Sequence, residues 1–267
     1  MLSIIPSLSW AQVTLDTVLP TFYDKSRGYE AVYVAGTCEP KELPDDLVTA
    51  QEPLIINLQE VDCTTFVEYV TACILGGISQ PDADDEGLQR WVERLRYRGG
   101  KRGNYATRKH YFSEWISDAA AMGWLTELTP DLRGAKKLDK RFSFMTAHPE
   151  YYPQLKQSAA LLAEVRSVEE KLNEQTLYYV PSAQIQLTYP QLKHGDIVTF
   201  VTDREGLDVQ HVGFVWRPSP QDTPRLLHAS SALGHVTISR ESLQGYAQKA
   251  KRCVGIRVVR SLTPALP

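Results

Sequence analysis

The spacing of apolar residues divides the chain into a helix-rich part and, after Pro190, a strand-rich part. Apolar side chains recur at helical spacing from about 12 to 32 and again over 63–74, and three further amphipathic stripes follow within about 88–177. The pattern predicts an α+β fold in which helices precede an antiparallel sheet or small barrel spanning about 190–260. Beyond Pro190, short β-branched and alternating runs predict five strands, at 196–202, 211–216, 226–230, 236–239 and 253–259.

The helix that begins at Cys63 has clear signals at both ends. Asp62 is a favourable N-cap residue, and two glycines, Gly76 and Gly77, follow the last apolar position. A short apolar run at 31–36 predicts a strand or turn that approaches the same place. Cys63 is therefore expected in the first turn of a helix, with its side chain directed inward.

The strand predicted to begin at His211 places this residue and Gly213 on the same face, because side chains alternate along a strand. If the next strand folds back on it with Trp216 opposite Arg225, Gly213 lies opposite His228. His211 is then diagonal to His228. The missing side chain at Gly213 leaves room for the two imidazole rings to meet.

Composition sets the broad class of protein. The chain has 267 residues, of which 43% are hydrophobic and 23% charged, as in ordinary globular proteins. No stretch approaches the roughly 20 apolar residues of a transmembrane helix. The net charge of -3 gives no general attraction to polyanions despite a local basic run at 94–108, so nucleic acid is not an expected partner.

The cysteines suggest neither a disulfide scaffold nor a metal site. They form no C-x-x-C pair, and no Cys or His residues have the close spacing of zinc ligands. We therefore expect no metal and no cofactor. The four cysteines are Cys38, Cys63, Cys73 and Cys253.

The first 20 residues form a segment of their own ahead of a single domain at 21–267. They lack the basic start of a signal peptide but resemble the second half of one, with a small-x-small pattern at 9–11. Two interpretations stay open, a signal-peptide remnant and a short N-terminal segment of the mature fold. The first predicts a periplasmic or cell-envelope protein, whereas the second is equally compatible with the cytoplasm.

The chemistry of the chain is predicted to centre on Cys63. A cysteine at a helix N-terminus lies beside unpaired backbone N–H groups and the positive end of the helix dipole, which lower the thiol pKa and can hold an oxyanion. His211 would act as general base, with His228 orienting its ring in place of the more usual Asp or Asn. The competing interpretation makes Cys63 a small buried hydrophobic residue and His228 a structural histidine of the sheet.

Six segments resemble the NlpC-type papain-like cysteine cell-wall hydrolases, in particular their N-acetylmuramoyl-L-alanine amidase-like branch. The resemblance covers nearly the whole chain after about residue 20 and implies a nucleophile helix, a helical insertion at about 88–177 and a sheet. Thr64 and Thr65 stand where many members carry Ser-Gly, which favours the amidase branch over generic endopeptidases. The segments are 33–37 (YVAGT), 61–68 (VDCTTFVE), 109–115 (KHYFSEW), 144–149 (FMTAHP), 208–214 (DVQHVGF) and 227–231 (LHASS).

The resemblance implies hydrolysis of the amide bond between muramic acid and L-alanine in peptidoglycan fragments, including anhydro-muramyl forms. We expect the protein to be a monomer. Cys63 would form a thioester with the lactyl carbonyl. Two alternatives share every catalytic residue: an endopeptidase that cuts between D-glutamate and a diamino acid, and an acyltransferase of the same fold. A third, a non-catalytic peptidoglycan-binding module, is disfavoured by the presence of Cys63, His211 and His228 together.

Four further residues are candidate substrate contacts. Tyr33 could help to hold the oxyanion, with a core aromatic as the alternative, and Asp62 could contact the substrate in addition to capping its helix. His110 and Tyr111 precede an amphipathic helix and could touch the ligand. Trp115 on that helix is a further candidate because aromatic faces stack on sugar rings.

Overall fold

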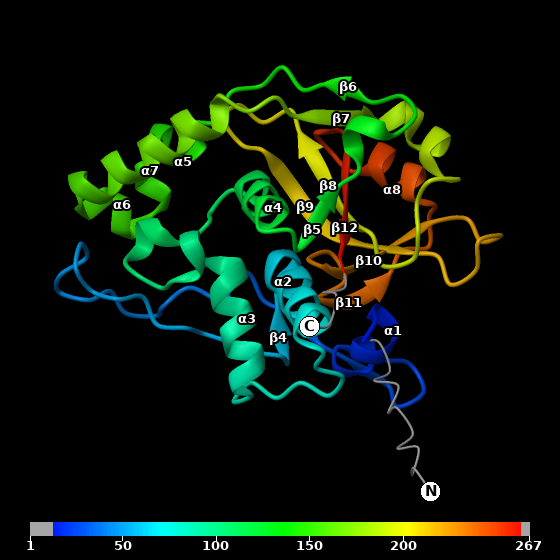
Figure 1. Cartoon of the computed structure of the whole chain (residues 1–267), viewed down its shortest axis with the longest axis horizontal. Helices are drawn as coiled ribbons and strands as arrows, with labels where there is room; N and C mark the ends of the chain where they lie inside the picture. The colour runs from blue at the N-terminus through cyan, green and yellow to red at the C-terminus, as the bar shows by residue number, and fades with distance from the viewer. Residues whose placement is uncertain (1–12, 263–267) are drawn as a thin grey trace, which may run out of the picture.

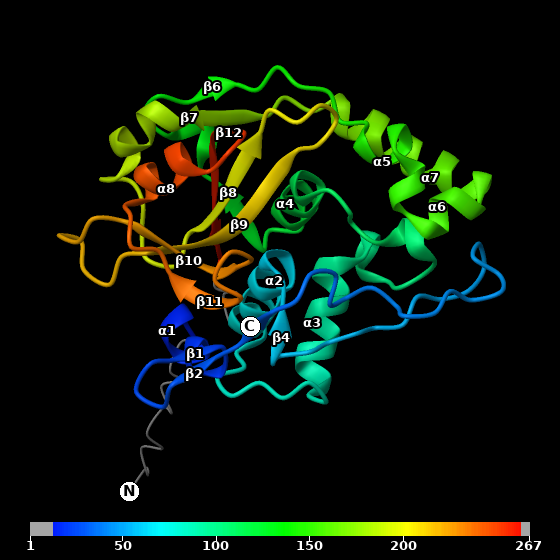
Figure 2. The same cartoon turned by 180° about the vertical axis from the view of Figure 1, so that it is seen from behind.

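The computed structural model describes residues 13–262, and it confirms the mixed α+β class. One long, curled sheet carries α2–α4 on one side, while α8 covers another part of it (Figure 1, Figure 2). Helices α5–α7 gather at the end of the molecule away from α8 and the β1–β2 hairpin in both views. The N-terminal segment that resembles a signal peptide lies mostly outside the described residues.

The helix predicted after Asp62 is confirmed as α2 (Cys63–Gly76). The Asp62 carboxylate accepts a hydrogen bond from the backbone N–H of Thr65, and the Thr65 hydroxyl group in turn accepts one from the Asp62 N–H, so each residue caps the other. Gly77 ends the helix in the left-handed conformation, at φ 68°, which favours glycine. Most of α2 is buried between α3 and the sheet, so its first residue, Cys63, is held on a fixed support.

The five strands predicted after Pro190 are all present. Strand β9 pairs with β10 in the predicted register, with Trp216 opposite Arg225. The sheet order is β4-β3-β11-β10-β9-β8-β12-β7-β6, with β5 paired to β12. The strands are β8 (Ile197–Thr202), β9 (Val209–Trp216), β10 (Arg225–Ser230), β11 (His235–Ile238) and β12 (Cys253–Ser261).

The helix predicted over 12–32 is wrong beyond Thr21. After α1 (Leu15–Val18) and a 3-10 turn, the chain forms a small hairpin, β1 (Tyr23–Asp24) and β2 (Tyr29–Glu30). The reason is local turn chemistry: the Asp24 carboxylate accepts hydrogen bonds from the backbone N–H groups of two following residues, and Gly28 takes a positive φ. The apolar run that follows supplies β3 (Val32–Tyr33), which is parallel to β4 (Glu60–Val61).

The segment from 88 to 177 is helix-rich as predicted, but it is not an all-helical insertion. Its strand β5 (Leu125–Glu127) pairs with β12 of the main sheet, and β6 (Lys136–Lys137) pairs with β7 (Tyr178–Pro181). Helix α8 (Leu243–Lys249), between β11 and β12, was not predicted. The helices of the middle segment are α3 (Glu86–Arg96), α4 (Phe112–Ala121), α5 (Phe144–Ala147), α6 (Pro153–Gln157) and α7 (Ala159–Asn173).

A bilayer-spanning helix would need a long apolar stretch, and none of the helices within 13–262 has one.

Candidate active site

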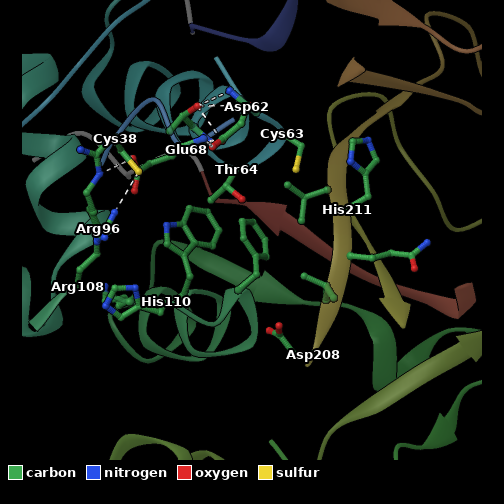
Figure 3. A pocket seen from close by; sticks show the side chains of 18 of the residues that line it. Cys38, Asp62, Cys63, Thr64, Glu68, Arg96, Arg108, His110, Asp208 and His211 are labelled. Atoms are coloured by element: carbon green, nitrogen blue, oxygen red, sulfur yellow. Dashed lines mark hydrogen bonds and ion pairs between the residues drawn. The ribbon is translucent and has the colours of Figure 1, made fainter. Parts of the chain in front are cut away.

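A pocket of about 260 Å³ lies where the N-terminus of α2 meets the start of β9 and the segment leading into α4. Cys63 and His211 both line it, as do Asp62 and Asp208. Figure 3 shows the Cys63 sulfur on the side of the pocket where His211 lies, with Arg108 and His110 at the other end. The fold therefore brings together the nucleophile and the base that were predicted from residues 148 positions apart in the sequence (211 − 63 = 148).

The two histidines meet as the register predicted. Nε2 of His211 lies 2.7 Å from Nδ1 of His228, and the two rings are nearly perpendicular, at 86°. Gly213 makes this approach possible, because a Cβ atom there would lie 2.6 Å from the Leu227 carbonyl oxygen and 3.1 Å from Cβ of His228. The glycine is thus required by the close packing of β9 on β10.

The contact with His228 occupies one ring nitrogen of His211, Nε2. Nδ1 lies outside this contact, and it can accept a proton only in the tautomer in which Nε2 carries the hydrogen and donates it to His228 Nδ1. The contact therefore holds the His211 ring in one orientation.

The charge state of the pair differs from the sequence-based expectation. Burial raises the pKa of the Cys63 thiol to about 11, and the charge of Asp62 adds to the effect, although a hydrogen bond involving the Val212 backbone opposes it. Burial also lowers the pKa of His211 to about 3, with His228 contributing, and burial lowers the pKa of His228 to about 4. The predicted lowering of the thiol pKa is therefore wrong, and these shifts favour the neutral forms of the thiol and of both imidazoles near pH 7.

Asp62 combines its cap with a link to the loop in front of the pocket. One of its carboxylate oxygens accepts the Thr65 N–H at 2.8 Å, and the other accepts the Gly36 N–H at 3.2 Å. Tyr33 is half-buried on β3, and its pKa is raised by burial first and then by the nearby Cys63 and Asp62. Its phenol therefore lies near Cys63, although Tyr33 does not line the pocket.

The other two candidate substrate contacts, His110 and Tyr111, differ in their position relative to the pocket. His110 lines the pocket, but its Nε2 lies 2.9 Å from the Tyr105 carbonyl oxygen, and burial lowers its pKa well below the usual value. Tyr111 does not line the pocket: it is buried, and its hydroxyl group donates to Glu169 at 2.6 Å. Tyr111, the N-cap residue of α4, thus points into the core formed with α7, and its ligand contact stays a prediction.

Two aromatic rings of α4 form one wall of the pocket. Phe112 and Trp115 are stacked, with ring centroids 4.8 Å apart and planes 22° from parallel. Trp115 is only 2% exposed, yet its indole nitrogen has no hydrogen-bond partner in the structure. An unpaired buried N–H is costly, and this one belongs to a residue that lines the pocket.

A buried ionic cluster at the far end of the pocket was not predicted. Arg108 donates to both carboxylate oxygens of Glu39 at 2.7 Å and to the sulfur of Cys38 at 3.2 Å. Arg96 forms a buried ion pair with Glu68 on α2 at 2.6 Å. The sequence shows the basic run 94–108 but gives no sign that two of its arginines turn inward. Both arginines have carboxylate partners from other segments, which allows their burial.

Tyr246 is a second residue that sequence reasoning missed. It lies on α8, and its ring centroid is 5.1 Å from that of His228 and 6.1 Å from that of His211. The histidine pair is thus covered by an aromatic ring on the side of the sheet that α8 occupies. A seven-residue helix between two strands gives too short an apolar pattern to be recognised.

Among the described residues, no group of three or more His, Cys, Asp or Glu side chains is arranged to hold a metal ion.

The fold is similar to several solved structures. A Bacteroides fragilis protein described as a candidate xylanase is 35% identical, with a TM-score of 0.75 over 92% of this chain and 100% of that one. An N-acetylmuramoyl-L-alanine amidase from Bacteroides uniformis is 30% identical, with a TM-score of 0.77 over 93% of this chain and 98% of that one. The Legionella pneumophila protein LPG0564, 19% identical with a TM-score of 0.65 over 92% and 87% of the two chains, shares the fold.

No match was found among curated protein sequences. Residues 40–256, most of the chain, match a single protein family, the AmiA-like family, which is described as N-acetylmuramoyl-L-alanine amidase-like. The match includes Cys63, His211 and His228. The chain therefore belongs to the AmiA-like, N-acetylmuramoyl-L-alanine amidase-like family.

Proposed function

We propose that the protein is a cysteine amidase that cleaves the bond between N-acetylmuramic or anhydro-muramic acid and L-alanine in muropeptides. The observation that carries this proposal is the arrangement of Cys63 at the α2 N-terminus with His211 and His228, in a member of an amidase-like family. The Cys-before-His order and the helix-then-sheet arrangement also support an NlpC-type, papain-like core. We further propose that it acts as a monomer in the periplasm or cell envelope, where peptidoglycan fragments occur.

Because Cys63 and His211 are both neutral before the reaction, the first step combines attack by the sulfur with transfer of its proton. As the Cys63 sulfur attacks the lactyl carbonyl carbon, its proton passes to Nδ1 of His211, and the carbonyl π-electrons move to the oxygen. The backbone N–H of Cys63 at the helix N-terminus, with Tyr33 near it, stabilises the resulting oxyanion. Transferring the proton only during the attack avoids placing two opposite charges in a buried site beforehand.

The remaining steps return the enzyme to its starting state. The imidazolium of His211 gives its proton to the amine of L-alanine, the C–N bond breaks, and a muramoyl thioester remains on Cys63. A water molecule then gives a proton to His211 Nδ1 and attacks the thioester carbonyl. Collapse of this second intermediate releases the muramic acid carboxyl group and restores the thiol. His228 keeps Nδ1 of His211 available throughout.

The aromatic wall supports recognition of a sugar on the acyl side of the scissile bond. Phe112 and Trp115 present ring surface in the same pocket as Cys63, and aromatic rings stack on the apolar faces of sugars. The unpaired indole N–H of Trp115 can donate to a hydroxyl or acetamido oxygen.

Cleavage of a glycosidic bond fits this pocket poorly. It requires two carboxyl groups free to act as acid and as nucleophile or base. Here Glu68 is paired with Arg96 and Glu39 with Arg108, and Asp62 accepts hydrogen bonds from backbone N–H groups of α2 and the neighbouring loop. Asp208, the remaining carboxyl group of the pocket, accepts the Ser113 N–H at 2.7 Å. The thiol and imidazole pair would remain unused.

Mass analysis of the products tests the proposal against its rivals. The substrates are a defined anhydro-muropeptide and the same peptide without its sugar. The amidase predicts a peptide that begins with L-alanine, released only from the sugar-bearing substrate. A cut after D-glutamate would instead establish the endopeptidase, and transfer products formed in the presence of added amines would establish the acyltransferase.

A further inference from the structure

Asp208 lines the active-site pocket, but the proposed mechanism gives it no role. The residue is buried, and Figure 3 shows its carboxyl group apart from the Cys63 sulfur and the His211 ring. Burial of a carboxyl group is costly unless its oxygens accept hydrogen bonds. The function of Asp208 is therefore to be found in the groups that it contacts.

The Asp208 side chain caps helix α4 from a distant part of the chain. Tyr111, the N-cap residue of α4, makes no side-chain capping hydrogen bond. Instead, Oδ2 of Asp208 accepts the backbone N–H of Ser113, the second residue of the helix, at 2.7 Å. The N–H groups of a first helical turn have no acceptor within their own helix. Asp208, immediately before β9, thus supplies the acceptor that the N-cap residue lacks.

A second contact joins the same serine to β12. Arg257 on this strand is fully buried and donates to the Ser113 hydroxyl oxygen at 2.7 Å. Two further guanidinium N–H groups of Arg257 donate to the carboxylate oxygens of Glu127 on β5, at 3.0 and 3.1 Å. The first turn of α4 is therefore attached to the sheet at two points, Asp208 and Arg257.

The turn that carries Asp208 has a fixed position of its own. The Asp208 carbonyl oxygen accepts the Thr202 N–H at 3.3 Å, across the β8–β9 hairpin. Within the turn, Gly206 takes a positive φ of 73°, and its carbonyl oxygen accepts the N–H groups of Ser143 and Phe144. A Cβ atom at Gly206 would lie 2.7 Å from the Phe144 backbone nitrogen, so the turn packs directly on the start of α5.

Asp208 and Ser113 each adjoin a different part of the active site. His211 follows Asp208 closely, on β9, whereas the aromatic wall residues Phe112 and Trp115 lie beside Ser113 on α4. We propose that Asp208 is a positioning residue that holds the aromatic wall of α4 in a fixed place relative to His211. The inference rests on the proposed amidase function, in which this wall binds the sugar.

A positioning role and a general role in stability have different kinetic effects. Partial unfolding reduces the amount of active enzyme and hence the apparent kcat, but it does not change the KM of the molecules that remain folded. A displaced wall instead weakens the contacts with the sugar in the folded enzyme, so KM rises.

Steady-state kinetics on a defined muramoyl-peptide separates the two. In Asp208→Ala the KM should rise about 3- to 10-fold, the effect of one lost hydrogen bond to the substrate. Asp208→Asn keeps an oxygen that can accept the Ser113 N–H, so its KM should stay close to that of wild type. Should Asp208→Ala fail to fold, Asp208→Glu provides the test, because its longer side chain keeps the acceptor but displaces the helix and should also raise KM.

Asp196→Ala is the matched control. Asp196 is likewise buried, immediately precedes strand β8 of the same sheet and accepts a backbone N–H, that of Lys193, at 2.7 Å. It does not line the pocket. Its replacement should lower the free energy of unfolding and leave KM unchanged.

A double variant shows whether Asp208 acts through the wall. Because a displaced wall no longer offers the Trp115 N–H to the substrate, adding Trp115→Phe to Asp208→Ala should raise KM less than it does in wild type. An undiminished effect of Trp115→Phe in the double variant would overturn the inference and leave the amidase standing. An unchanged KM in the Ala or Glu variant of Asp208, or an equal rise in Asp196→Ala, would do the same. Failure of the wild type to cleave the substrate would overturn the proposed function and the inference with it.

Discussion

Nε2 of His211 and Nδ1 of His228 lie 2.7 Å apart on adjacent strands, so one neutral imidazole directs the other toward Cys63. A carboxylate in the place of His228 would stabilise an imidazolium strongly, whereas a neutral imidazole stabilises it less. This difference agrees with the lowered pKa of His211, about 3. In the proposed mechanism, His211 would therefore stay neutral until it receives the proton of the thiol.

Removing each histidine should have a different effect. His211→Ala removes the base itself and should reduce kcat by at least about 10³-fold, whereas His228→Ala removes only its orienting partner and should leave a residual rate, reduced roughly 10- to 100-fold. Steady-state kinetics on a muramoyl-peptide measures both. Equal losses in the two variants would show that His228 does more than position His211.

Low pH should destabilise the fold through the same pair. An unfolded histidine has a pKa near 6.5, but burial lowers that of His228 to about 4 and that of His211 to about 3. Between these values the unfolded chain binds protons that the folded chain does not, so the free energy of unfolding falls as the pH is lowered from about 6.5 to 4. For His228 alone the shift corresponds to on the order of 3 kcal/mol.

Urea denaturation at several pH values measures this effect. Other buried groups also titrate, so the relevant quantity is the difference in slope between wild type and the His211→Gln/His228→Gln double variant. The variant should lose less stability between pH 6.5 and 4. His148→Gln, which makes the same substitution at an exposed histidine outside the pair, serves as the substitution control. Identical slopes in all three proteins would contradict the assigned charge states.

Substitution of two aspartate N-caps can distinguish an effect on stability from an effect on catalysis. Asp62→Ala and Asp85→Ala each remove a side-chain N-cap, that of α2 and that of α3 respectively, and each should cost about 1 kcal/mol of unfolding free energy. Only the first cap lies in the active-site pocket and holds the Gly36 loop, so only Asp62→Ala should also lower kcat/KM. Parallel melting and activity measurements test this. A comparable loss of activity in Asp85→Ala would mean that the pocket responds to stability in general.

Trp115→Phe should reveal what the aromatic wall binds. The substitution keeps the ring that stacks on Phe112 but removes the indole N–H, which has no protein partner. The KM for a sugar-bearing substrate should rise about 3- to 10-fold, the effect of one hydrogen bond. Trp91→Phe on α3, whose ring packs against Trp124, should leave KM unchanged. An unaltered KM in the Trp115 variant would exclude this donor from substrate binding.

Local signals in the sequence predicted the central parts of the site. The Asp62 cap and the terminal glycines defined α2, and the alternation after His211 with Gly213 as a gap predicted the histidine contact. Both predictions depend on residues that are close together in the sequence, where the local pattern of residue types is informative. The same local reasoning failed at 22–32, where apolar spacing favoured a helix but the Asp24 turn and Gly28 produce a hairpin.

Features that depend on distant contacts were not predictable. The pKa of Cys63 follows from how deeply the folded chain buries its thiol, which outweighs the helix N-terminus. The inward turn of Arg108 requires Glu39, which comes from a separate loop. Tyr246 reaches the histidines only because α8 packs on β10. In each case the residues in contact are far apart in the sequence, so local residue spacing cannot predict the contact.

Rapid acid quenching followed by mass spectrometry of the intact protein shows whether Cys63 carries the muramoyl group as a thioester. Wild type mixed with excess muramoyl-peptide should gain the mass of one muramoyl group, located on the peptide that contains Cys63, and Cys63→Ala should gain none. An adduct built from the stem peptide, or full turnover by Cys63→Ala, would contradict the account.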